Sequence, residues 1–321
     1  MSSKYKLASF VSVILVIVLI LLFIQNRYQR KEMPAVEQDS SQDINSDQEA
    51  FYGAYRIREP EKKLEALEKF IMDFPDSSYI GSAKREMFKA TVKVWPGDRE
   101  KLFAAADRVT APADKPGKQM RGNFYNYQFV ARELLSAGIF LDDAERFASK
   151  SLELLEKRQF IEYEKKQYVE WGEDIPSDDE MDEKYIKELA AYSTTLGRIY
   201  LEKGRTAEGE KILQDAYDVD PAIAQAAIGL AEIAESRGDN TRAMDLLTAA
   251  IFTAGSALED ARERTEALYR KTHNGSLDGL EALLDTVHKR LFPNPVNVDK
   301  YLPDPSRSER TVLAEFFTGA G

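Results

Sequence analysis

Few side chains of this 321-residue chain have the type and spacing that chemistry requires. The two histidines, His273 and His288, belong to no His-Glu-x-x-His pattern, and we place His288, beside Lys289 and Arg290 in a predicted helix over 277–291, on a polar face. The lack of cysteine excludes thiolate metal sites, disulfides and cysteine nucleophiles within these residues. Neither a glycine-rich phosphate-binding motif nor Gly-x-Ser-x-Gly occurs, and no carboxylate pair stands out as a general acid and base. We therefore predict no catalytic, cofactor-binding or metal-binding residue here.

The acidic stretch from Glu173 to Lys184 is the strongest candidate for a cation site, because Ca²⁺ prefers several carboxylate ligands. It lacks the alternating Asp-x-Asp-x-Asp-Gly order that wraps the ion. Ser177, followed three residues later by Glu180, instead predicts a capping box at the start of a helix.

A degenerate repeat with a period of 34 residues predicts the elements of the second half of the chain. Small residues at Gly197 and Ala231, and at Gly209 and Ala243, let two antiparallel helices approach closely. Each unit is thus predicted to be a helical hairpin that buries its apolar face by stacking on its neighbours. The recurring positions are Leu196, Gly197, Tyr200, Gly204, Leu213, Ala216 and Pro221, then Leu230, Ala231, Ala234, Gly238, Leu247, Ala250 and Gly255. We expect Tyr200, Leu213, Leu230 and Leu247 to be buried in the seams.

This spacing resembles the tetratricopeptide repeat family, in which 34 residues form a helix–turn–helix. Two units match well, at about 190–223 and 224–257, and a weaker match over 134–155, with Gly138 and Ala144, carries one extra turn residue. An ordinary helical bundle with small residues at its crossings is the alternative.

The resemblance implies a concave surface made by the first helix of each hairpin. The positions that face inward by register are Thr194, Arg198, Leu201, Glu202, Gln225, Ile228, Glu232 and Glu235. Such a mixed, mostly acidic groove suits an amphipathic or basic protein segment. The alternative is that this face packs against other helices of the same chain, such as the one over 277–291.

An N-terminal apolar run over 7–24 predicts a transmembrane anchor, since eighteen helical residues span roughly 27 Å. Tyr5 and Tyr28 suit the two membrane interfaces, and no small-x-small site follows to mark a cleaved signal peptide, which is the alternative. The positive charges on the two sides of this run are equal in number, so they do not decide its orientation. We place residues 1–6 in the cytosol and the body outside it, periplasmic or extracellular, at a bacterial-type inner or cell membrane.

The remaining chain is predicted to form a flexible tether over 25–50, a helical region with degenerate repeats over 51–175, the repeats and a following helix over 176–291, and a proline-rich linker over 292–310. Helices are expected at 61–74, 98–109, 123–137 and 142–158. The Phe-Pro-Asp-Ser ending at 74–77 resembles that of repeat proteins of bacterial envelope assembly. A net charge of −11 argues against nucleic acid as a partner.

The last residues depart from the helical pattern. Residues 311–317 read as a β-strand, and the segment 310–321 resembles the opening strand of a thioredoxin-like domain, whose Cys-x-x-Cys directly follows. A frayed apolar tail is the alternative.

Together these features predict an all-α, tetratricopeptide-type solenoid behind a single membrane anchor, with a lone C-terminal strand. The expected function is protein binding as the non-catalytic part of a thiol–disulfide protein. An envelope-assembly scaffold without a redox role is the alternative, and a helical-repeat hydrolase is a third possibility. The sequence leaves the partner and the oligomeric state open.

Overall fold

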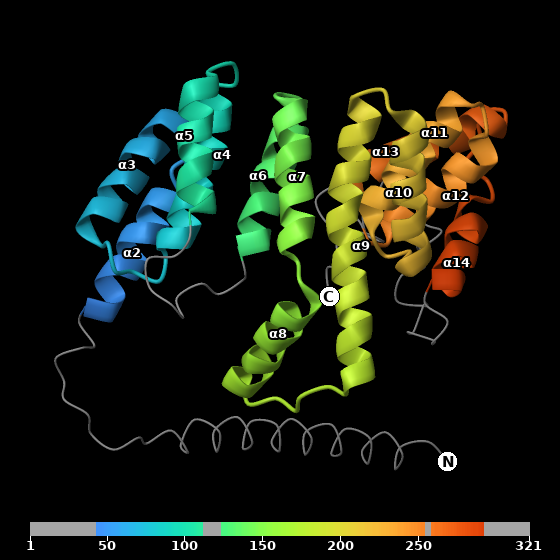
Figure 1. The fold of residues 1–321 in the computed structure, drawn as a ribbon. Helices are drawn as coiled ribbons and strands as arrows, with labels where there is room; N and C mark the ends of the chain where they lie inside the picture. The colour runs from blue at the N-terminus through green and yellow to red at the C-terminus, as the bar shows by residue number, and fades with distance from the viewer. Residues whose placement is uncertain (1–42, 112–122, 254–257, 292–321) are drawn as a thin grey trace, which may run out of the picture. The chain divides into compact units, whose positions relative to one another are not determined.

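The structure, a computed structural model, describes residues 43–111, 123–253 and 258–291, which form α-helices and no β-strand (Figure 1). This confirms the all-α class for the described residues. No helix in these ranges is long and apolar enough to cross a membrane. The predicted anchor at 7–24, the linker over 292–310 and the strand over 311–317 lie outside them.

The chain divides into two units, 1–52 and 53–321, and the helix α2 (Asp43–Tyr55) crosses the division. All packing given below lies within the second unit. Its helices are α3 (Pro60–Asp73), α4 (Ile80–Val94), α5 (Arg99–Thr110), α6 (Asn123–Ala137), α7 (Leu141–Leu154), α8 (Lys157–Trp171), α9 (Asp178–Glu202), α10 (Thr206–Val219), α11 (Ala224–Ser236), α12 (Asn240–Ile251), α13 (Leu258–Thr272) and α14 (Leu280–Leu291).

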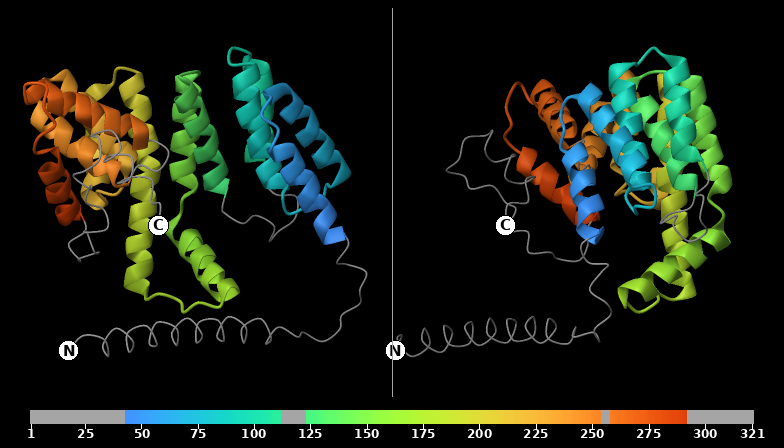
Figure 2. Two further views of the ribbon diagram at one scale, coloured as in Figure 1. Left: turned by 180° about the vertical axis from the view of Figure 1, so that it is seen from behind. Right: turned by 90° about the vertical axis from the view of Figure 1, so that its left-hand side faces the viewer.

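Successive helices of this unit pack as hairpins, which Figure 2 shows from two further sides. The most extensive pairs are α6 with α7, α9 with α10, and α11 with α12. Each pair then packs on the next, through α7 on α9, α10 on α11 and α12 on α13. The described residues therefore form a repeat-like array of helical hairpins.

The turn inside each of these three hairpins has the same backbone conformation. Gly138, Gly204 and Gly238 follow the first helix with φ of 65°, 75° and 77°, a left-handed region that glycine enters without strain. In each turn the next backbone N–H donates to the carbonyl five residues earlier, at 3.2, 2.8 and 2.9 Å. Gly204 and Gly238 stand one predicted period apart. The 34-residue repeat is therefore a repeat of backbone structure as well as of residue type.

The turn between α6 and α7 carries the extra residue predicted for the weaker repeat. Phe140 ends that turn with φ of 47°, so a residue with a bulky side chain adopts the left-handed region. Such a conformation costs about 1–3 kcal/mol and persists only where surrounding contacts maintain it. The Phe140 ring packs edge to face on Phe103, with centroids 6.1 Å apart.

The seams between hairpins depend on close helix contacts at glycine. A Cβ atom at Gly197 would stand 2.9 Å from Cγ of Leu213, and one at Gly229 would stand 2.7 Å from Cδ1 of the same leucine. Leu213, fully buried on α10, thus fills the space between a glycine of its own hairpin and a glycine of the next. Leu230 and Leu247 are also buried, as predicted.

Tyr200 differs from the prediction, because it is only half-buried. The guanidinium of Arg205 lies 3.8 Å from the centroid of its ring, so the tyrosine faces the edge of the seam rather than its interior. His288 also differs: it is half-buried rather than on a polar face, and its ring stands edge to face on Phe252, with centroids 4.9 Å apart.

Several element boundaries depart from the expectations. Residues 43–50, predicted as tether, belong to α2. The helix predicted over 142–158 ends at Leu154, because Leu155 turns into an apolar cluster with Phe124, Phe160 and Tyr192. The separate helix α8 follows, and α9 begins twelve residues before the predicted repeat boundary at Ala190.

The predicted capping box at the start of α9 is confirmed. The Glu180 backbone N–H donates to Oγ of Ser177 at 3.3 Å, and the Ser177 N–H donates to Oε2 of Glu180 at 2.8 Å. The hydroxyl and backbone hydrogen bonds from Ser177 lower the pKa of the Glu180 carboxyl. The carboxylates of this stretch therefore lie in the first turn of a helix, as the predicted capping box implies, rather than in a calcium-binding loop.

Candidate functional site

Three of the residues predicted to line the concave groove pack inside the chain. Thr194 is buried and its hydroxyl donates to the Ala190 carbonyl at 3.0 Å. Ile228 is buried in the core of the last hairpins. Leu201 is half-buried in the α9–α10 seam, where a Cβ at Gly209 would stand 2.7 Å from its Cδ2.

Three of the four charged residues predicted for the groove belong to an ion-pair ladder across α9, α11 and α13. Nη1 of Arg198 lies 2.8 Å from Oε2 of Glu232, although its N–H groups do not have hydrogen-bonding geometry toward that oxygen. Arg264 of α13 continues the ladder, since its Nη1 lies 3.6 Å from Oε1 of Glu232 and its Nη2 donates to Oε1 of Glu235 at 2.8 Å.

Burial alone would lower the pKa of Arg264, but the hydrogen bond that it donates to Glu235 and the negative charges of Glu235, Glu232 and Asp260 raise this pKa above its ordinary value. The two glutamates are therefore paired with cations of the same chain. Of the predicted groove residues, Glu202 and Gln225 are the exposed ones. The predicted groove remains a prediction, and the acidity on which it relied is offset within the structure.

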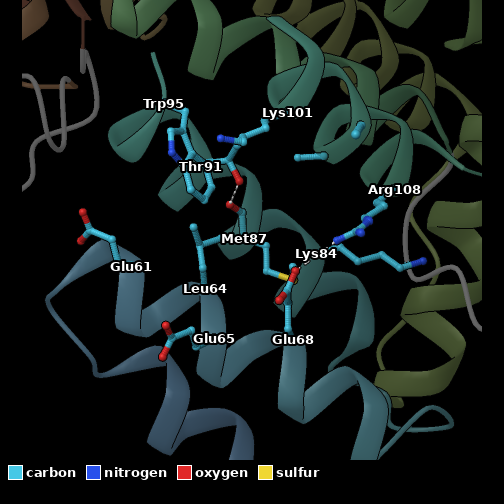
Figure 3. A pocket seen from close by; sticks show the side chains of 12 residues that line it. Glu61, Leu64, Glu65, Glu68, Lys84, Met87, Thr91, Trp95, Lys101 and Arg108 are labelled. Carbon is cyan, nitrogen blue, oxygen red and sulfur yellow. Dashed lines mark hydrogen bonds and ion pairs between the residues drawn. The ribbon is translucent and has the colours of Figure 1, made fainter. Parts of the chain in front are cut away.

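A second surface is a groove of about 440 Å³ between α3 and α5, with α4 as its floor (Figure 3). Leu64 of α3 and Met87 and Thr91 of α4 lie at its base, and Ala104 and Ala105 line the wall formed by α5. Both α3 and α5 pack on α4, so the groove follows from the order of the helices.

The groove has charges of opposite sign on its two sides. Glu61, Glu65 and Glu68 lie along one edge of α3, while Lys101 and Arg108 come from α5 (Figure 3). Nη1 of Arg108 lies 3.6 Å from Oε1 of Glu68, which bridges the two sides.

The start of α5, which forms one side of the groove, is fixed by a local N-cap. Asp98 caps α5 by accepting from the Lys101 backbone N–H at 3.1 Å, and hydrogen bonds from Lys101 lower the pKa of this aspartate. Nζ of Lys101 also lies 3.1 Å from Oδ2 of Asp98 and 4.3 Å from the centroid of the Trp95 ring. The exposed Trp95 side chain is thereby held at the end of the groove (Figure 3).

This groove lies on different helices from the predicted one. The Pro75 turn between α3 and α4 corresponds to the Pro221 turn between α10 and α11. In each, the backbone N–H two residues after the proline donates to the carbonyl of the residue before it, from Ser77 to Phe74 at 3.1 Å and from Ile223 to Asp220 at 3.0 Å. By that correspondence α3 and α5 are second helices of their hairpins, whereas the predicted groove belongs to first helices. The residues of this site were not predicted from the sequence.

A scan of protein-family models and a search of curated proteins found no match to the chain.

Proposed function

We propose that this chain is a membrane-tethered protein-binding module of the tetratricopeptide type, with no chemistry of its own in the described residues. The observation that carries the proposal is the repeated glycine turn, which gives the successive hairpins the same geometry. Stacked hairpins contact mainly their neighbours and leave long side surfaces open to partners. The groove between α3 and α5 is one such surface.

Tethering to a membrane is proposed from the sequence. The apolar run at 7–24 has the length of a membrane-spanning helix and lacks a cleavage site after it. We propose that the helical array lies outside the cytosol, where a large translocated domain follows a short N-terminal end.

We further propose that the module serves a thiol–disulfide protein, because residues 310–321 resemble the opening strand of a thioredoxin-like domain. The alternative, an envelope-assembly scaffold without a redox role, is supported by the Phe-Pro-Asp-Ser ending at 74–77. Reading the coding sequence after Gly321 separates the two. A Cys-x-x-Cys within a few codons supports attachment to a thiol–disulfide domain, whereas a stop codon favours the scaffold.

Site-specific photocrosslinking in the membranes of the native host tests the binding function. A photoreactive amino acid replaces Gln225 on a first helix, Trp95 at the end of the groove, and one exposed residue on each of the remaining described helices except α14. On α14 it replaces Glu281, which serves as the background position. We expect discrete light-dependent adducts at some positions and none at the background position. Adducts at no position would overturn the proposed function.

A further inference from the structure

We infer that the groove between α3 and α5 binds an amphipathic helix of a partner protein, and that this helix presents Lys or Arg along the edge that faces α3. The inference rests on the proposed binding function and adds the class of partner. It concerns second helices, so it is independent of the groove predicted on the first helices.

The apolar part of the groove has the composition of a helix-binding surface. Met87 at its base has a flexible, polarizable side chain that adapts to different apolar partners. Ala104 and Ala105 expose only methyl groups, so the backbone of a docked helix can approach α5 closely. Trp95 is 36% exposed, and a tryptophan at the end of an apolar groove is a frequent anchor of protein interfaces.

The length of the groove matches a helix. From Glu61 to Glu68, α3 rises about 10 Å, or roughly two helical turns. Two turns correspond to the i, i+3, i+4 and i+7 anchor spacing by which amphipathic helices lie in apolar grooves.

The α3 side of the groove carries carboxylates that are not neutralised within the described residues. Glu61 and Glu65 are exposed, stand one turn apart on the same edge, and form no ion pair with any described residue. Like charges at this spacing destabilise a helix by about 0.2–0.5 kcal/mol, and a cationic partner would remove that penalty.

The α5 side is already largely paired, so it contributes less to charge selection. Lys101 is bound to Asp98 and lies over Trp95, while Arg108 is paired with Glu68. Lys84 of α4 also lines the groove, is half-buried and forms no ion pair with any described residue, so it offsets one of the two free carboxylates (Figure 3). The charge left to recruit a partner is negative on balance, and its carboxylates lie along α3. An anionic membrane or a nucleic acid would be repelled there, whereas a helix with a basic edge gains both apolar burial and complementary charge.

A charge-swap experiment tests the inference on the full chain in nanodiscs of zwitterionic lipid. The probes are two labelled helical peptides of about 18 residues with the same apolar stripe, one with Lys on both edges and one with Glu on both edges. Binding is followed by fluorescence anisotropy, with empty nanodiscs as the blank. We expect saturable binding of the Lys-edged peptide, weakened by added salt, and little binding of the Glu-edged peptide.

The double variant Glu61→Lys/Glu65→Lys should bind the Lys-edged peptide about tenfold more weakly and gain affinity for the Glu-edged peptide. Its matched control is Glu263→Lys/Glu281→Lys, which reverses the charge of two exposed glutamates, one on α13 and one on α14. Glu281, like Glu61, lies in the first turn of its helix. A second variant, Ala104→Gln, lengthens an exposed side chain inside the groove without changing charge and should block both peptides. The exposed Ala207→Gln on α10 is its control.

Unchanged circular dichroism shows that each variant folds. Equal binding of the Lys-edged peptide to the groove variants and to their controls would overturn the inference. Self-association of the chain that disappears in the double variant would assign the groove to a second copy and would also overturn it. Neither result touches the proposed function if photocrosslinked adducts form elsewhere on the array.

Discussion

Replacing Leu213 with alanine should remove the side chain that joins two hairpins. Its Cγ and Cδ1 atoms occupy the space over Gly197 and Gly229, neither of which has a side chain that could move into the resulting cavity. Leucine-to-alanine changes in cores cost about 2–5 kcal/mol, and the cost rises with the cavity that remains. We therefore expect a loss in the upper half of that range, about 3.5–5 kcal/mol.

A second substitution shows whether this contact is the cause. Alanine at Gly197 would place a Cβ 2.9 and 3.0 Å from two Leu213 atoms, an overpacking worth about 1–3 kcal/mol, offset by about 1 kcal/mol of helix propensity. In the Leu213→Ala background, the nearest remaining contact is Cγ2 of Ile212 at 3.2 Å. There Gly197→Ala should be neutral or stabilising by up to about 1 kcal/mol.

The assay is urea unfolding of the full chain in detergent micelles, followed by circular dichroism, for the wild type, both single variants and the double variant. Val219→Ala, at a 41% exposed position of the same helix as Leu213, is the control and should change the free energy of unfolding by less than about 0.5 kcal/mol. We expect a coupling energy of about 1–3 kcal/mol between positions 197 and 213. If Gly197→Ala had the same effect in both backgrounds, the close contact described here would not determine the stability of the seam.

Three further outcomes are expected. Ser177→Ala should cost about 0.5–2 kcal/mol by removing a cap, with faster hydrogen exchange confined to the first turns of α9. In the wild type, the lowered pKa of Glu180 means that the cap contributes fully above about pH 4.5 and loses strength as the pH falls below this value. The protection factors of the same turns, which are exchange rates corrected for the intrinsic pH dependence of exchange, should therefore fall in acid; protection factors that do not change with pH would contradict the capping role. A reporter active only in the cytosol, fused after Gly321, should give no signal, and a bright reporter would reverse the proposed topology.

The sequence predicted the repeats well because their signals are local. The left-handed turns require glycine at Gly204 and Gly238, and the close helix contact requires a small residue at Gly197, so residue type reports backbone geometry directly. The capping box is likewise contained in four residues. Such features could be read before the packing was known.

The rest depended on contacts between distant residues. No glycine or proline marks the end of α7, because burial of Leu155 in a tertiary cluster ends it. The charges of Glu232 and Glu235 looked available until Arg264, on a helix that was not predicted, was found beside both. The sequence alone does not distinguish Glu61 and Glu65 from other glutamates, and only the position of α5 makes them the edge of a groove.

The helix α9 belongs to two cores at once. Its Ile199 packs with residues of α4 to α7, including Phe88 and Leu134, whereas its Ala190 packs with the core of α10 to α14. A buried hydrogen bond of 2.7 Å from Gln128 of α6 to Thr195 adds a polar link at the same place. A mechanical load between a partner held at α3 and the chain beyond α14 would thus pass through α9. Melting of this one helix would divide the array into two halves that each retain a core, so the mechanical continuity of the array depends on α9.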